Sequence, residues 1–184
     1  KHLRIIGGKY KGRRINPPPG FKARPTTDFA RESLFNILGN RVDYEEITVL
    51  DLFSGTGSIS YEFASRGTKE VHLSEQDVKH SAGIRRILKD IGFSNIKAIH
   101  IDVRAFLRTC TAKYDVVFAD PPYDLKWFRD IPDLVMSSGV LREDGFFVLE
   151  HPRGMTFNGH SLFREHRNYG GVNFSFFAFS STDR

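Results

Sequence analysis

An acidic residue, two prolines and a tyrosine follow one apolar segment of the chain, and these residue types suit chemistry on an amine. The segment reads YDVVFADPPY, from Tyr114 to Tyr123. Neither proline has a backbone N–H to donate, so the strand that the apolar residues predict must end before Pro121. The Asp120 carboxylate and the Pro121 carbonyl are then two hydrogen-bond acceptors at a strand end, and the prolines add no donor that competes for them.

An exocyclic amine of a nucleobase is a poor nucleophile, because its lone pair is delocalised into the ring. Two acceptors that take both amine protons would turn the lone pair toward an electrophile, and the Asp120 carboxylate would stabilise the positive charge that grows on nitrogen. Pro121 and Pro122 would hold the backbone in one shape, while Tyr123 would stack on a flipped-out base. The alternative is that Asp-Pro-Pro-Tyr is only a rigid turn.

Three further acidic residues stand where apolar segments end. Asp51 lies near the end of ITVLDL, Glu75 follows EVHLS, and Asp102 follows IKAIHI. Ligands of parallel sheets bind outside the carboxyl ends of the strands, so we expect these three carboxylates at one edge of a sheet. They suit a ligand with an ammonium group, a cis-diol and an exocyclic amine, which describes S-adenosylmethionine. For any single one of them, the alternative is an N-cap of the following helix.

The segment after the first of these strands, DLFSGTGSIS, is a glycine-containing loop. Gly55 and Gly57 allow a tight turn and a close approach of the backbone to a ligand. A dinucleotide-binding fingerprint would need a third glycine at position 60, which is a serine, and Asp51 has the wrong charge to face a pyrophosphate. The loop therefore favours a nucleoside ligand without phosphates over the alternative of a nucleotide-dependent oxidoreductase.

Alternating strand and helix patterns must position these residues. Apolar segments predict strands at 47–52, 70–74, 96–101, 114–119 and 145–150, with a helix-like stretch between each pair, and 24–39 predicts a helix capped by Thr27 or Asp28. Two aromatic-rich segments that meet at Gly170-Gly171 predict a C-terminal hairpin. The expected fold class is α/β, with a mostly parallel sheet that helices cover on both faces.

Positive charge is concentrated at the start of the chain. Residues 1–27 hold eight lysines and arginines and no acidic residue, whereas the remainder holds 19 basic against 22 acidic residues. Apolar residues alternate with these charges around Gly7-Gly8, which predicts two short strands joined by a turn rather than a solvated tail. We expect residues 1–24 to be a basic arm that meets a polyanion. The candidate contacts are Arg4, Lys9, Lys11, Arg13, Arg14 and Arg24.

Composition excludes several classes of protein. The 184 residues, 40% of them hydrophobic and 27% charged, are typical of one globular domain with its own core. The single cysteine, Cys110, cannot form an internal disulfide, and the seven histidines show no ligand spacing, so we expect no metal. No segment predicts a membrane span or a signal peptide. We therefore expect a cytoplasmic protein, and a monomer.

Several motifs occur in the order typical of class I S-adenosylmethionine-dependent methyltransferases. They are VLDLFSGTGSIS, the acid of HLSEQD, the acid of HIDVRAFL, and DVVFADPPY. More narrowly, RIIGGKYKGRRI followed by RPTTDFARESLFNIL resembles the opening of the bacterial small-subunit rRNA guanine-N2 methyltransferases called RsmD, and the resemblance runs from Arg4 to about Glu150. It implies a Rossmann-like, seven-stranded sheet in residues 25–184 whose C-terminal hairpin makes one strand antiparallel.

The resemblance also implies a function and a site. The protein would methylate the N2 amine of a guanine in 16S rRNA, either as RNA or within an assembling small subunit, and the basic arm would contact this RNA. Asp51, Gly55 and Gly57 would hold the methionine end of S-adenosylmethionine, Glu75 its ribose and Asp102 its adenine. Ser54, Gln76, Val103 and Thr26 complete the predicted cofactor site, and Asp120, Pro121, Pro122 and Tyr123 would be catalytic. Asp-Pro-Pro-Tyr also serves adenine-N6 enzymes, so the motif alone leaves that alternative open, beside a non-catalytic nucleic-acid-binding module.

Overall fold

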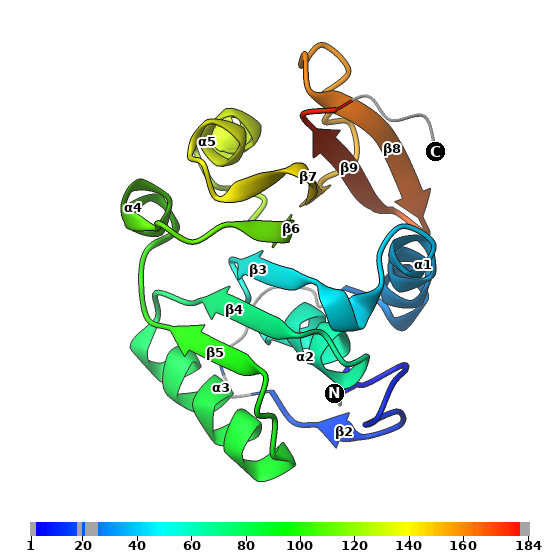
Figure 1. Ribbon diagram of the computed structural model, residues 1–184, viewed down its shortest axis with the longest axis vertical. Coiled ribbons are helices and arrows are strands. Elements are labelled where there is room, and N and C mark those ends of the chain that lie inside the picture. Colours follow the sequence, from blue (N-terminus) through cyan, green and yellow to red (C-terminus); the bar gives the residue numbers. More distant parts are fainter. Residues whose placement is uncertain (1–2, 18–19, 21–25, 181–184) are drawn as a thin grey trace.

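A seven-stranded sheet forms the centre of the protein. The computed structural model describes residues 3–17, 20 and 26–180, and its sheet has the strand order β5-β4-β3-β6-β7-β9-β8 (Figure 1). The strands are β3 (Thr48–Leu52), β4 (Glu70–Ser74), β5 (Ile96–Ile99), β6 (Tyr114–Ala119), β7 (Leu141–His151), β8 (Phe163–Tyr169) and β9 (Val172–Ala178). β5, β4, β3, β6 and β7 run parallel, and β9 is antiparallel to both β7 and β8. The predicted α/β fold with its C-terminal hairpin is confirmed.

Helices cover both faces of this sheet. Within the described residues, α1 (Asp28–Gly39), α2 (Ser58–Ser65) and α3 (Val78–Ile91) share one apolar core with the sheet, and α4 (Val103–Thr109) and α5 (Ile131–Ser137) share the other. Figure 1 shows α1 on the opposite side of the sheet from α4 and α5. Two 3-10 helices, Tyr44–Glu46 and Phe128–Asp130, precede β3 and α5. In the part of the chain that is described, every helix is too short or too polar to cross a membrane.

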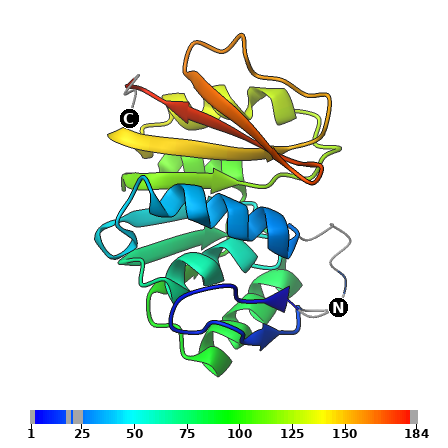
Figure 2. The same ribbon diagram turned by 90° about the vertical axis from the view of Figure 1, so that its right-hand side faces the viewer.

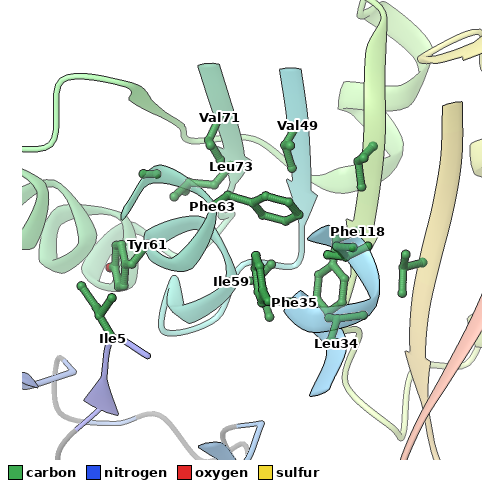
Figure 3. Packing of buried hydrophobic residues seen from close by; sticks show 14 of the residues in the cluster. Ile5, Leu34, Phe35, Val49, Ile59, Tyr61, Phe63, Val71, Leu73 and Phe118 are labelled. Atoms are coloured by element: carbon green, nitrogen blue, oxygen red, sulfur yellow. The ribbon is translucent and has the colours of Figure 1, made fainter. Parts of the chain in front are cut away.

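The two cores exist because successive side chains of a strand point to opposite faces. On one face, Phe63 of α2 packs with Phe35 of α1 and Val49 of β3, and the two ring centroids are 4.7 Å apart (Figure 3). On the other face, Leu50 of β3 packs with residues of α4 and α5, including Val135. Packing on both faces fixes the central strands, and so fixes the residues that follow their carboxyl ends.

Side-chain caps place three helix starts at the carboxyl ends of the strands. Thr27 caps α1, Asp77 caps α3 and Asp102 caps α4, each through an oxygen that accepts a backbone N–H of the first turn. Of the two residues predicted as possible caps of α1, Thr27 is therefore the correct one. The capping residues of these helices lie at the same edge of the sheet, where a ligand of a parallel sheet would bind.

Two strand bounds differ by more than one residue from those that the sequence predicts. β5 ends at Ile99 rather than at residue 101, because it lies at the edge of the sheet and pairs with β4, whose Ser74 is opposite Ile99. β7 begins at Leu141 rather than at residue 145, because Leu141 pairs with Tyr114 before the register shifts. The intervening residues 142–144 are polar and exposed, which is why the apolar pattern missed them.

The basic segment at the start of the chain forms the predicted hairpin, but its turns run from Gly8 to Arg13 rather than centring on Gly7-Gly8. Leu3–Arg4 (β1) pairs with Arg14–Ile15 (β2), and the connection between them packs on α2. The Lys9 N–H donates to the Ser65 carbonyl at 2.7 Å, and a Cβ at Gly8 would lie 2.0 Å from the same oxygen. A glycine is required there because the two backbones approach closely.

The hairpin lies along α2, below α1 in Figure 2. One end of the hairpin lies toward the carboxyl ends of the parallel strands, and the other end lies toward their amino ends. Its connection contacts Ser65, the last residue of α2, near the edge where the parallel strands begin. Its paired strands lie near the start of α1, where the Arg4 guanidinium is 3.4 Å from the Asp28 carboxylate and Arg14 pairs with Arg4. The strands of the hairpin are therefore nearer to the carboxyl ends of the sheet than its connection is.

Buried charges join the hairpin to the helices. Arg31 of α1 and Glu62 of α2 are each 1% exposed and lie 3.3 Å apart, and Arg31 also pairs with Asp28 at 2.9 Å. The Glu62 carboxylate accepts the Ile6 N–H, and Arg31 donates to the Arg4 carbonyl. Because buried charges need their hydrogen bonds satisfied, these contacts hold the described part of the hairpin as a fixed extension of the sheet domain.

Candidate active site

The loop between β3 and α2 contains three residues in left-handed backbone conformations. Phe53 has a φ of 55°, uncommon for an aromatic residue, and Gly55 and Gly57 have φ values of 56° and 85°. A Cβ at Gly57 would lie 2.4 Å from the Tyr61 hydroxyl oxygen, whereas a Cβ at Gly55 would meet nothing nearer than a backbone oxygen at 4.0 Å. Gly57 therefore allows the loop to pack on α2, and the backbone at Gly55 leaves room for a ligand.

Asp51 is a buried acid at the end of β3. Its side chain is 1% exposed and accepts a hydrogen bond from the Ser60 hydroxyl at 2.7 Å. The pKa of Asp51 is raised to about 7, chiefly by burial and to a smaller extent by the nearby Glu75 charge, against the opposing effect of the Ser60 hydrogen bonds. Ser60 stands where a dinucleotide-binding loop would have its third glycine, and here it holds this carboxylate in place.

The end of β4 brings a second acid to the loop. The N–H and the hydroxyl of Ser54 both contact the Ser74 carbonyl, at 3.3 and 3.1 Å, which ties the loop to β4. Glu75 follows Ser74, is half-buried, and accepts the Asp77 N–H at 2.9 Å. Gln76 is exposed beside it. Two of the predicted cofactor residues, Ser54 and Glu75, are thus brought together by the parallel pairing of β3 and β4.

Asp102 caps a helix. This was the alternative to cofactor binding that the sequence left open for each of the three strand-end acids. It is the N-cap of α4 and is half-buried, and the adjacent Val103 is buried in the first turn. The capping alternative is wrong for Asp51 and Glu75, because α2 begins after Gly57 and the cap of α3 is Asp77. A capping carboxylate has a second oxygen, so a contact of Asp102 with the cofactor stays a prediction.

The predicted catalytic acid lies between two strand ends. Ala119, the last residue of β6, pairs with Leu52 of β3 and with Leu149 of β7, and Asp120 follows it. This register places Asp120 at the centre of the carboxyl edge, with the Asp51 loop on one side and the end of β7 on the other. The parallel sheet therefore brings Asp51 and Asp120 to one site although 68 residues separate them.

The rest of the Asp-Pro-Pro-Tyr motif forms a turn at the surface. Pro121 is buried, Pro122 is exposed, and the Pro122 carbonyl accepts the Leu125 N–H at 3.1 Å. Tyr123 is 52% exposed, with its ring edge-on to the buried Phe128 at a centroid distance of 6.4 Å. The turn thus holds an aromatic ring at the rim of the site with a surface that a base can stack on.

Glu150 is a further buried acid at this edge, which the sequence analysis missed. It is 4% exposed at the end of β7, and its Oε1 accepts a hydrogen bond of 2.7 Å from the Thr26 hydroxyl. Burial raises the pKa of Asp120 well above its ordinary value, and the charge of Glu150 and a hydrogen bond to it raise it further, as does Asp51. Thr26, a predicted cofactor residue, is therefore bound to the neighbour of the predicted catalytic acid.

The site gathers negative charge without positive charge. Within residues 3–17, 20 and 26–180, no lysine or arginine forms an ion pair with Asp51, Glu75, Asp120 or Glu150. The same residues contain no cluster of three or more His, Cys, Asp or Glu side chains that could hold a metal ion. Because burial makes unpaired carboxylates costly, a positively charged organic ligand would be stabilised here.

Trp127 packs against Phe53, the loop residue with a left-handed backbone conformation. Its ring lies 5.8 Å from the Phe53 ring, and the Arg104 guanidinium lies 4.9 Å from the Trp127 ring. A hollow of about 400 Å³ adjoins it, lined by Arg104, Trp127, Asp130, Asp133, Leu134 and Ser137. None of the predicted site residues lines this hollow, so it is separate from the carboxylate cluster.

The predicted RNA contacts are exposed where the structure describes them. Arg4, Lys9, Lys11, Arg13 and Arg14 all have exposed side chains on the hairpin. Arg24 lies outside the described residues. The hairpin thus presents Arg4 and Arg14 near the carboxyl edge and Lys9 and Lys11 farther from it, and its contact with RNA stays a prediction.

Comparisons of the sequence with known proteins agree with one another. Residues 3–178 match the family described as Conserved hypothetical protein 95. The chain is 32% identical over 155 residues to the putative rRNA methyltransferase YlbH of Bacillus subtilis, which covers 82% of this chain and 83% of that protein. It is 30% identical over 148 residues to ribosomal RNA small subunit methyltransferase D of Escherichia coli, which covers 80% of this chain and 74% of that protein.

Solved structures match the fold over almost the whole chain. A structure described as the putative methyltransferase yhhF from Escherichia coli superposes with a TM-score of 0.82 at 27% identity, over 96% of this chain and 97% of that one. A 16S rRNA N2 methyltransferase of Thermus thermophilus, solved with AdoMet and guanosine, superposes with a TM-score of 0.75 at 22% identity, over 97% of this chain and 49% of that one. Because its identity is only 22%, the second match shows a similar fold and nothing about function.

Proposed function

Because the chain belongs to the Conserved hypothetical protein 95 family, with ribosomal RNA small subunit methyltransferase D among its relatives, we propose that it methylates the exocyclic N2 amine of a guanine in 16S rRNA. The methyl donor in this proposal is S-adenosylmethionine. The observation that carries the proposal is the position of Asp120 and Pro121, two acceptors at the centre of the carboxyl edge, next to the β3 loop. Such a reaction takes place where ribosomal subunits are made, in the cytoplasm.

The residues of the site fit this donor. S-adenosylmethionine supplies a methyl group on a positively charged sulfur and also carries an ammonium group. Asp51, buried and without a cationic partner among the described residues, would bind the ammonium, and the open backbone at Gly55 would lie against the methionine end. Glu75 would accept hydrogen bonds from the ribose hydroxyls. Gln76, Asp102 and Val103 would line the adenine side.

The chemistry at the base follows from three residues of the β6 motif. Asp120 and the Pro121 carbonyl would accept the two protons of the amine, which turns its lone pair toward the methyl group. Tyr123 would stack on the flipped-out base, a contact worth about 1–3 kcal/mol. Adenine also has an exocyclic amine, so the same three residues would serve an adenine-N6 enzyme, and identification of the methylated nucleoside decides between the two bases.

The test is single-turnover methyl transfer to 16S rRNA and to small subunits, with the product nucleoside identified by mass spectrometry. We expect N2-methylguanosine from the parent protein. Asp120→Ala should lower the rate by about 10²-fold or more, because the carboxylate acts mainly on charge that forms in the transition state. Cofactor affinity should barely change.

Asp124→Ala is the matched control, since Asp124 is an exposed acid four residues further along the same turn. It should keep the parental rate. N6-methyladenosine as the product would favour the adenine alternative. A parental rate for Asp120→Ala at saturating RNA and cofactor would contradict the mechanism, and would leave Asp-Pro-Pro-Tyr as the rigid turn.

A further inference from the structure

Phe29, in the first turn of α1, is an exposed aromatic residue that the proposed reaction does not use. It is 60% exposed, against 52% for Tyr123, the residue proposed to stack on the target base. Single exposed apolar side chains are common in soluble proteins, so exposure alone assigns no role. Phe29 differs from such residues because it lies between the predicted catalytic acid and the basic hairpin.

Contacts with the turn between β8 and β9 hold the Phe29 ring. The Tyr169 ring packs edge-on against it, at a centroid distance of 6.2 Å and an interplanar angle of 84°. A Cβ at Gly170 would lie 3.6 Å from the Phe29 Cδ1, so the backbone of this turn also passes close to the ring. These contacts leave more than half of the residue open to solvent. A ring held in this way can bind another ring at little cost in side-chain entropy.

Phe29 and Tyr123 flank the predicted catalytic acid on opposite faces of the sheet. The Thr26 hydroxyl donates to Glu150 at 2.7 Å, which anchors the start of α1 at the end of β7. The register of β6 and β7 places Asp120 beside Glu150. Tyr123 packs on the core that contains α4 and α5, whereas α1 covers the other face (Figure 1). An RNA strand whose target base lies between Asp120 and Tyr123 would therefore reach Phe29 with its neighbouring part.

Two arginines of the hairpin add positive charge beside Phe29. Arg4 and Arg14 are paired directly opposite each other, and both are exposed. The Arg4 guanidinium is 3.4 Å from Asp28, the residue before Phe29, but Asp28 also pairs with the buried Arg31. In the described part of the chain, Arg14 has no acidic partner. Like charges directly opposite each other on paired strands repel, and a phosphate group bound between them would relieve this repulsion.

We propose that Phe29 stacks on a nucleotide of the RNA substrate next to the target nucleotide, and that Arg4 and Arg14 bind a phosphate of the same strand. This inference deepens the proposed function and rests on it. Aromatic rings that take bases, beside arginines that follow the phosphates, are the parts of a surface that binds single-stranded nucleic acid. Because every base has a face to stack with, Phe29 holds the strand without reading its sequence.

The flipping of the target base explains why such a ring is needed. A base that leaves the stack costs its neighbour one stacking partner, and the enzyme must offset this cost. The Phe29 ring supplies a replacement partner to the neighbour, while Tyr123 supplies one to the target base. The two exposed rings thus divide between them the stacking that the RNA loses.

The surface around Phe29 does not suit a contact between two copies of the protein. A stable interface buries about 800 Å² on each partner and is depleted of charge at its core. Phe29 is instead one exposed ring beside arginines, and a symmetric contact would bring these like charges together. A nucleic acid strand supplies both an aromatic face and the negative charge that complements Arg4 and Arg14.

Affinity for a short single-stranded oligoadenylate RNA, measured by fluorescence anisotropy without S-adenosylmethionine, tests the stacking. Phe29→Ala should weaken binding by about 5- to 150-fold, the loss expected for one stacked base. Phe29→Leu keeps an apolar side chain without an aromatic face, so it should weaken binding nearly as much, whereas Phe29→Trp should keep the parental affinity or exceed it. The salt slope should stay parental in all three variants, since none changes a charge.

Phe179→Ala is the matched control, because Phe179 is an exposed phenylalanine just after β9, at the edge where the parallel strands begin. It should bind the RNA as the parent does. Parental affinity in both Phe29→Ala and Phe29→Leu would overturn the proposal, and so would a parent that does not bind the oligoadenylate. A dimer of the parent that Phe29→Ala dissociates in sedimentation would make Phe29 a contact between copies, against the proposal.

Tryptophan fluorescence reports the contact directly. Trp127 is the single tryptophan of the chain, so Phe29→Trp combined with Trp127→Phe leaves one indole, at the proposed contact. The oligoadenylate should quench its fluorescence, because the stacked base lies face to face with the indole ring. Phe179→Trp in the same Trp127→Phe background should show no quenching. Equal quenching at the two positions would mean that the RNA binds without a defined place, and the proposal would be wrong.

Single-turnover rates separate binding by Phe29 from a structural role. Phe29→Ala should raise the concentration of 16S rRNA that gives half the maximal rate by the same factor as its loss in affinity. At saturating RNA the rate should stay within about 3-fold of the parental rate, because a contact remote from the reacting atoms binds ground state and transition state alike. A structural residue would instead lower the melting temperature and weaken cofactor binding as well.

The two proposals fail in different ways. If the parent makes no N2-methylguanosine, the proposed function fails, while the fluorescence of the Phe29→Trp variant still shows whether RNA reaches this ring. If the parent methylates guanine N2 but Phe29→Ala and Phe29→Leu bind RNA and react as the parent does, the role of Phe29 is wrong and the proposed function stands.

Discussion

At the scale of single residues, the site is a set of acids that have no lysine or arginine partner among the described residues. Asp51 and Asp120 are both held in surroundings that raise the pKa of the carboxyl group, chiefly through burial. Such groups destabilise the unliganded fold when they ionise, and a cationic ligand offsets that cost. The properties that favour binding therefore lower the stability of the empty protein at neutral pH.

Asp51→Asn should make the unliganded protein less sensitive to pH. The pKa of Asp51 rises from 3.8 to about 7 on folding, so between these values the folded protein binds the proton more tightly than the unfolded chain. The protonated Asp51 therefore stabilises the folded protein fully below about pH 4, and this contribution to the free energy of unfolding is lost as the pH rises through 7. The parent should lose about 1–3 kcal/mol more than Asp51→Asn between pH 5 and pH 8. Urea unfolding at both pH values measures this difference, and parallel losses would show that Asp51 titrates normally.

The sequence located most acids of the site but missed Glu150, for a physical reason. A carboxylate that follows an apolar segment, as Asp51 and Asp120 do, is visible because strand ends are visible. Glu150 also follows such a segment, but its role depends on Thr26, which is 124 residues away along the chain. The left-handed conformation of Phe53 left no sign in the sequence, because only packing imposes it on an aromatic residue.

At the scale of elements, the basic hairpin shows how a local pattern can be right about strands and wrong about their connection. The alternation of apolar residues predicted the pairing of β1 with β2. The position of the turn was wrong because the backbone at Lys9 and Tyr10 hydrogen-bonds Ser65 of α2 rather than closing at Gly7-Gly8. A sequence pattern does not show which surface a short strand pair docks on.

The orientation of the hairpin divides its charges into two groups that should differ in RNA binding. Arg4 and Arg14 lie by the start of α1, whereas Lys9 and Lys11 belong to the connection that contacts Ser65, the last residue of α2. Replacing both arginines by alanine should weaken RNA binding and reduce the magnitude of the salt slope by roughly one unit per lost phosphate contact.

The double alanine variant of Lys9 and Lys11 is the control with the same change in charge. It should have the smaller effect, and cofactor binding should be unchanged in both variants. Melting temperatures are needed alongside, because Arg4 also pairs with Asp28. Salt slopes that fall equally in the two variants would mean that RNA contacts the whole hairpin, and unchanged slopes would make the hairpin a purely structural element.

At the scale of the whole molecule, the periodic pattern of apolar residues predicted the parallel strands of the sheet. The resemblance to the RsmD family predicted that the C-terminal hairpin completes this sheet. Apolar strand segments alternating with helical ones are enough to indicate a parallel sheet covered on both faces. The aromatic segments on either side of Gly170-Gly171 indicated a hairpin, which β8 and β9 form. That this hairpin joins the sheet beyond β7 could not follow from the two segments, since nothing local marks their partner.

A truncated chain tests how far the sheet depends on its C-terminal hairpin. A variant ending at Tyr169 lacks β9, so β7 loses its pairing with β9, and the buried Phe147 and Leu149 are left at an open edge. We expect this variant to aggregate or to lose cooperative unfolding. A variant ending at Ser180 keeps all of β9 and should keep the parental melting temperature. A soluble, cooperatively folded variant ending at Tyr169 would show that β3 to β7 are sufficient.

The position of β9 also sets an order on biosynthesis. β9 follows β8 along the chain, yet it lies between β8 and β7 in the sheet. A nascent chain that has already made β7 therefore cannot complete the sheet until residues 172–178 have left the ribosome. Until then the strand that carries Glu150 lacks one neighbour, and the Asp120–Glu150 pair lacks its final support. The edge that carries Asp120 and Glu150 is thus completed only after β9 has emerged, not as the central strands emerge.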